Sequence, residues 1–143
     1  SSPDTRINFP LACPDEGAFI GWKKCTIYIP ITGTGLVTRK PVIVKLCILN
    51  TSKRSSATSR KCRCDRAEVL DIQDERGNSL VCEELNDGRI VMHDDVVSYS
   101  TLDPYFTYEV GKIVSVDDFD NCRWHECAPG IHFFITRREA VEY

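Results

Sequence analysis

The chain has 143 residues, of which 42% are hydrophobic and 27% are charged, and its formal net charge is −3. This length suits one domain that buries roughly two-thirds of its unfolded surface, and the composition argues against disorder. The small negative charge excludes a generally basic nucleic-acid binder. No apolar run approaches the roughly 20 residues that a membrane span requires.

Runs of aromatic and β-branched residues, separated by turns, predict strands along most of the chain. In chain order, the predicted strands are residues 18–22, 25–29, 42–49, 67–72, 79–82, 89–92, 96–99, 105–110, 113–116 and 131–135. Residues 50–63 are polar, basic and rich in serine, which predicts a loop. Thr136 is a predicted N-cap with Glu139 at the capping-box position, and together they open a C-terminal helix.

These elements predict the α+β class. We expect a single β-rich domain at residues 17–143, with a mixed or antiparallel curved sheet and a short C-terminal helix, after an N-terminal extension at residues 1–16. The first residue is not Met, so we expect a larger parent polypeptide or a fusion partner.

The eight cysteines are expected to be free thiols from a reducing compartment. Cys25, Cys47 and Cys82 lie in apolar, strand-like runs, where a thiol packs as a small hydrophobic group. Trp22 and Lys23 are interpreted as a core aromatic residue beside a surface cation.

Six cations lie within residues 53–66, against the single carboxylate of Asp65. They are Lys53, Arg54, Arg60, Lys61, Arg63 and Arg66. Guanidinium groups among hydroxyl groups suit a phosphate-bearing ligand or another anionic partner. The alternative is a solvated loop whose arginines pair with the acidic residues 94–95 or 117–118. The candidate ligand-binding residues in this loop are Arg54, Arg60, Lys61 and Arg63.

A second cluster combines Cys122, His125, Cys127 and His132, with Cys62 and Cys64 as further candidates. Zinc needs about four nitrogen or sulfur ligands, usually in paired short spacings. One residue between Cys62 and Cys64 is too tight for that pattern, and the spacing from Cys122 to Cys127 is at its loose end. We therefore favour inert thiols and a buried histidine, and expect no metal and no cofactor.

Four segments carry a resemblance to a known family. They are residues 19–24 (Phe-Ile-Gly-Trp-Lys-Lys), residues 53–64, residues 108–112 and residues 123–134, which end in Cys-x-x-Gly-Ile-His-Phe-Phe. Together they resemble a domain of phage, giant-virus and bacterial proteins that is often found beside pentapeptide repeats and has no known function. A weaker likeness extends to the rapid-lysis B proteins of T-even-like phages. The resemblance implies a viral, phage or phage-exposed bacterial source. We expect a location in the host cytoplasm, with the virion as the alternative, and no membrane association.

Residues 130–143 allow an enzymatic interpretation. A Gly-Ile-His-Phe segment followed by a helix with Ala140 and Tyr143 resembles part of the NAD-consuming ADP-ribosyltransferases. This resemblance implies that His132 or Phe133 lines a cleft for the nicotinamide ribose and that Tyr143 stacks beside it. The partner motifs of such enzymes are not found earlier in the chain, and the glutamates of this segment lie on the helix.

We therefore favour a non-enzymatic recognition or adaptor module that binds an anionic partner through the cationic loop. The alternatives are an ADP-ribosyltransferase-like enzyme that uses NAD and a structural virion component. His132 and Tyr143 join the four loop cations as candidate ligand-binding residues.

Overall fold

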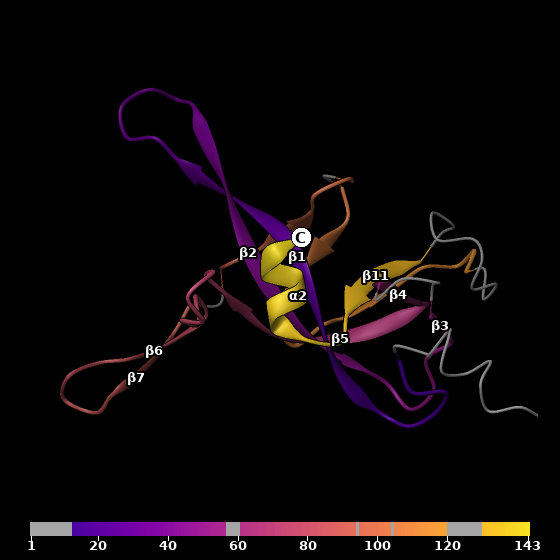
Figure 1. Ribbon diagram of the computed structural model, residues 1–143. Coiled ribbons are helices and arrows are strands. Elements are labelled where there is room, and N and C mark those ends of the chain that lie inside the picture. The colour runs from indigo at the N-terminus through magenta and orange to yellow at the C-terminus, as the bar shows by residue number, and fades with distance from the viewer. Residues whose placement is uncertain (1–12, 57–60, 94, 104, 120–129) are drawn as a thin grey trace, which may run out of the picture.

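The computed structural model describes residues 13–56, 61–93, 95–103, 105–119 and 130–143. In chain order, the elements within these residues are β1 (Phe19–Pro30), β2 (Val37–Ile48), β3 (Arg54–Ser56), β4 (Lys61–Cys64), β5 (Arg66–Gln73), β6 (Cys82–Glu84), β7 (Ile90–Met92), β8 (Ser98–Ser100), β9 (Thr107–Tyr108), β10 (Ile113–Ser115), β11 (Ile131–Phe134) and α2 (Arg137–Glu142). All strand pairs among them are antiparallel. The structure thus confirms a β-rich fold with a curled antiparallel sheet and a short C-terminal helix (Figure 1).

The main sheet follows the order β10-β5-β2-β1-β11-β4-β3, and β8 and β9 lie off this path. One edge of β1 pairs with β2 along its whole length. The other edge is shared between two strands. Trp22 pairs with Phe134 of β11, and Cys25 pairs with Ser100 of β8. We call the part of β1 between these two pairings, from Trp22 to Cys25, the fork.

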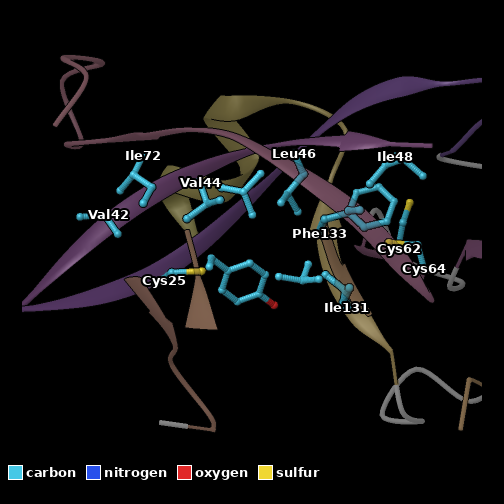
Figure 2. Packing of buried hydrophobic residues seen from close by; sticks show 14 of the residues in the cluster. Cys25, Val42, Val44, Leu46, Ile48, Cys62, Cys64, Ile72, Ile131 and Phe133 are labelled. Carbon is cyan, nitrogen blue, oxygen red and sulfur yellow. The ribbon is translucent and has the colours of Figure 1, made fainter. Parts of the chain in front are cut away.

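Alternating side chains on β2, β11 and β4 build the core. Every second residue of β2 from Val42 to Ile48 is at most 1% exposed, because strand side chains alternate between the two faces. The residues that face them from β11 and β4 are Ile131, Phe133, Cys62 and Cys64 (Figure 2). The same alternation turns His132 and Phe134 away from this core, as the sequence predicted for His132.

The C-terminal helix α2 lies against β1, β2 and β11 (Figure 1). The predicted N-cap is confirmed: the backbone N–H of Glu139 donates to Thr136 Oγ1 at 3.2 Å. The last turn of α2 contains no basic residue, but Lys24 of β1 donates from Nζ to the carbonyl of Val141 at 3.2 Å. A cation at this end is favourable for the helix dipole. No helix within the described ranges is long and apolar enough to span a membrane.

The predicted loop at residues 50–63 is wrong in part, because it contains β3 and all of β4 except Cys64. β4 gains backbone partners on both edges, from β11 and from β3. Its cysteines fill the core, and Arg63 is also buried, with its guanidinium carbon 5.3 Å from the centroid of the Phe119 ring. The polar composition of this segment did not indicate β4, because its partner strand β11 lies far away in the sequence.

Between the predicted strands at residues 67–72 and 79–82, the described residues contain one isolated bridge, which joins Gln73 to Ser79. The chain then forms the separate β6–β7 hairpin, which projects from the main sheet (Figure 1). Cys82 is therefore exposed, contrary to expectation, whereas Cys25 and Cys64 are buried free thiols. The predicted strand at residues 105–110 shortens to β9, which pairs only with β8 in the described part of the chain.

Candidate functional site

A cleft of about 470 Å³ opens at the fork. Its polar lining includes Lys23, Lys24, Lys61, Asp103, His132 and Tyr143. These side chains come from β1, β4, β11, the segment after β8 and the end of α2. Because β11 and β8 pair with different parts of β1, at Trp22 and at Cys25, no single strand continues the ladder past the cleft.

Three amines are fixed at the cleft by contacts with the chain. Lys23 donates from Nζ to the backbone carbonyl of His132 at 2.9 Å. Lys24 holds the end of α2 through its contact with Val141. Lys61 donates to the phenol oxygen of Tyr143 at 3.1 Å, and its Nζ lies 4.9 Å from the centroid of that ring. The cleft therefore presents amines whose positions are set by β1, β4 and β11.

The surroundings of Lys23 and Tyr108 change how both groups titrate. Burial lowers the pKa of the Lys23 amine; Cys25 opposes this shift, and the charge of Lys61 adds to it. Burial also raises the pKa of the Tyr108 phenol well above its ordinary value, so this group stays protonated. The Lys23 amine lies 6.0 Å from the centroid of the Tyr108 ring.

Aromatic rings make up much of the apolar lining. The rings of Phe134 and Tyr143 have centroids 5.3 Å apart, and those of Phe106 and Tyr108 are also 5.3 Å apart. All four residues line the cleft. A flat ring with an attached anionic group would find aromatic faces and amines side by side here.

The structure brings together three of the predicted ligand-binding residues, Lys61, His132 and Tyr143, in this one cleft. Of the two residues that the ADP-ribosyltransferase resemblance offered for the cleft, His132 lines it. Phe133 instead points into the core and is 1% exposed. Arg60 lies outside the described residues.

The other predicted cations are used inside the protein. Arg54 donates to the carbonyls of Gly17 at 2.6 Å, Leu49 at 2.7 Å and Ser52 at 3.1 Å. Its guanidinium carbon lies 5.4 Å from the centroid of the Phe19 ring. With Arg63 buried and Arg54 bound to carbonyls, the described cations of residues 53–66 do not form one exposed face.

The predicted His and Cys cluster is not assembled among the described residues. Cys122, His125 and Cys127 lie outside them, and His132 faces the cleft whereas Cys62 and Cys64 face the core. In the part of the chain that the structure describes, no group of three His, Cys, Asp or Glu side chains is placed to hold a metal ion.

Sequence reasoning missed Lys23, Lys24 and Asp103. Lys23 was expected on the surface, but it is partly buried and lines the cleft. Two adjacent lysines inside an aromatic and apolar strand were the available signal, because consecutive charges are unusual in a strand with neighbours on both edges. Asp103 follows β8 and carried no comparable signal.

No curated protein and no solved structure matches the chain. A family described as being of unknown function, DUF5758, matches residues 9–140. This range includes every described strand and most of α2. The expectation of an uncharacterised domain is confirmed, whereas the association with phages, giant viruses and pentapeptide repeats stays a prediction. The chain therefore belongs to the family of unknown function DUF5758.

Proposed function

We propose that this domain is a recognition module that binds a phosphate-bearing ligand in the cleft at the fork. The observation that carries the proposal is the meeting of Lys23, Lys24 and Lys61, with Asp103 as the one carboxylate among the described residues of the lining. The ammonium groups of Lys24 and Lys61 donate strongly to phosphate oxygens, and a partly buried site strengthens that attraction.

The size and lining of the cleft also support a small ligand. Its volume of about 470 Å³ lies within the usual range for small-molecule sites, roughly 300–1,000 Å³. The Phe134 and Tyr143 rings lie next to the Lys61 amine and would contact a ring attached to the phosphate. An adaptor role within a viral or phage-related parent is part of the same proposal, with contact made through the cleft instead of a cationic loop.

Replacing Lys61 by Met is expected to weaken the binding of ADP and of inorganic pyrophosphate about tenfold, because one charged hydrogen bond to phosphate is lost. Isothermal titration calorimetry of the wild type and the variant measures this change. Lys40→Met is the matched control, since it removes the same charge from an exposed position of β2. Its affinity should stay within about twofold of the wild type.

Two outcomes would contradict the proposed function. One is that neither ADP nor pyrophosphate binds the wild-type domain. The other is that Lys61→Met and Lys40→Met bind both probes with the same affinity, which would place the anion away from the cleft. Affinity should also fall as the salt concentration rises, because salt screens the amines.

A second candidate is an NAD-using transferase or glycohydrolase, and the observation that favours it is that His132 and Tyr143 line the same cleft. Proton NMR of the domain mixed with NAD separates the two functions. We expect broadening of the NAD signals without release of nicotinamide, because NAD carries phosphates that a recognition module binds. Release of nicotinamide that is lost in His132→Ala but kept in Lys40→Met would establish the enzyme instead.

A further inference from the structure

We propose that Lys23 is a nucleophilic amine that captures the carbonyl group of an anionic aldehyde as an imine in the cleft. This inference rests on the proposed function, because the neighbouring lysines hold the anionic group while Lys23 reacts. It narrows the ligand from a phosphate-bearing compound to one that also carries an aldehyde.

The position of Lys23 follows from the fork. On β1 it lies between Trp22, which pairs with β11, and Cys25, which pairs with β8. Its side chain therefore enters the gap that the two strands leave open. The hydrogen bond from Nζ to the His132 carbonyl, at 2.9 Å, holds the nitrogen at the lining of the cleft.

An amine attacks a carbonyl only in its neutral form. Burial and the nearby Lys61 charge lower the pKa of Lys23, so more of it is neutral near pH 7 than of an exposed lysine. Cys25 and Cys64 oppose this shift but do not reverse it, because burial is the largest of its causes.

The other lysines of the cleft suit the anionic group of such a ligand. Lys24 and Lys61 supply positive charge for a phosphate group, and the centroid of the Tyr143 ring lies 4.9 Å from the Lys61 amine. Asp103 is a carboxylate of the same cleft and can carry protons during the reaction. Amine, anion site and proton carrier are thus present in one cleft.

The reaction is balanced without an oxidant or a reductant. The lone pair of the Lys23 nitrogen forms a bond to the carbonyl carbon, and one N–H proton moves to the carbonyl oxygen to give a carbinolamine. The hydroxyl then leaves with the second N–H proton as water, and a C=N bond remains. Asp103 can relay the proton from the nitrogen to the departing hydroxyl.

Pyridoxal phosphate and pyridoxal are the two probes, and each rate is taken relative to the rate of the same probe with Nα-acetyl-lysine, because pyridoxal without its phosphate closes in part to a cyclic hemiacetal that slows its reaction with any amine. After incubation near neutral pH and reduction with borohydride, we expect pyridoxal phosphate to add its own mass less one oxygen atom, with Lys23 as the modified residue in peptide mapping. Pyridoxal should modify Lys23 at least about tenfold more slowly, because it lacks the group that the other lysines hold.

Substitutions test whether Lys23 is the reacting amine and whether Lys61 holds the phosphate. Lys23→Met and Lys23→Arg should both lose the modification, and thermal unfolding followed by circular dichroism verifies that each is folded. Lys61→Met should react with the two probes at more similar rates, whereas Lys40→Met should behave as the wild type. Modification that spreads evenly over the lysines, that persists in Lys23→Arg, or that is equally fast with both probes would overturn the inference.

Pyridoxine phosphate separates this inference from the proposed function, because it keeps the ring and the phosphate but has an alcohol in place of the aldehyde. If it binds in calorimetry and pyridoxal phosphate still leaves Lys23 unmodified, the imine is refuted and the recognition module stands. If neither pyridoxine phosphate nor pyrophosphate binds, the proposed function fails as well.

Discussion

Raising the pH from about 8 to about 11 is expected to destabilise the domain by about 4–6 kcal/mol through two buried thiols alone. Burial raises the pKa of Cys25 and of Cys64 from 9.0 to about 12. Below pH 9 both thiols are protonated in the folded and the unfolded chain. Between about pH 9 and 12 the unfolded chain loses these protons while the folded chain keeps them, so unfolding becomes more favourable as the pH rises.

Two residues of the cleft also titrate in this range. Tyr108 acts in the same direction as the thiols, because burial raises its pKa. Lys23 acts in the opposite direction: its pKa is lowered, so stability rises with pH until the unfolded amine is also neutral, above its ordinary value of 10.5. Above that pH the amine contributes no further change, and the thiols and the phenol determine the slope.

Urea unfolding in the presence of a reductant, at about pH 8 and about pH 11, measures the effect. Cys25→Ala and Cys64→Ala should each reduce the alkaline loss of stability by about 2–3 kcal/mol. Cys82→Ala is the matched control, because that side chain is exposed, and it should keep the full loss. The same alkaline loss in all three variants would show that the buried thiols are not its cause.

Replacing Gly21 by Ala is expected to destabilise the domain by about 1–3 kcal/mol, although a strand glycine with free space around it gains stability from this change. A Cβ at Gly21 would lie 2.6 Å from Cδ2 of Phe133. The Phe133 ring is 1% exposed and packs against the Phe19 ring, with centroids 5.8 Å apart, so it has little room to move.

A double-mutant cycle tests this clash directly. Phe133→Leu replaces the ring with a side chain that can adopt another rotamer, so Gly21→Ala should cost much less in that background than in the wild type. Chemical unfolding of the four proteins gives the coupling energy. Additive effects, or a more stable Gly21→Ala variant, would mean that the ring does not limit this position.

The longest and most regular elements could be predicted from the sequence because their signals are local. The apolar run at residues 42–49 marks β2, and Thr136 with Glu139 marks the start of α2. β4 could not be found in the same way, because its cationic residues resemble a loop until β11 supplies a partner on one edge. The alternation that turns His132 toward the cleft was predictable once β11 was recognised.

The candidate site was only partly predictable. The sequence indicates Lys61 as part of a cationic loop, and His132 and Tyr143 as part of an enzyme-like segment. Nothing in the sequence indicates that the three side chains line one cleft. Lys23 was misjudged because its partial burial depends on the fork, which is a property of strand pairing and not of local composition. The sequence thus identified part of the lining without identifying the cleft.

The fork also has a consequence for folding kinetics. The β1–β2 hairpin joins neighbouring segments, but Lys23 is 109 residues from His132 and Lys24 is 117 residues from Val141. Contacts of such long range form slowly, because the chain loses the conformational entropy of a large loop before these contacts stabilise the fold. A partly folded chain that has only its local hairpins therefore lacks a cleft, and ligand binding would measure the fraction of molecules that have completed folding.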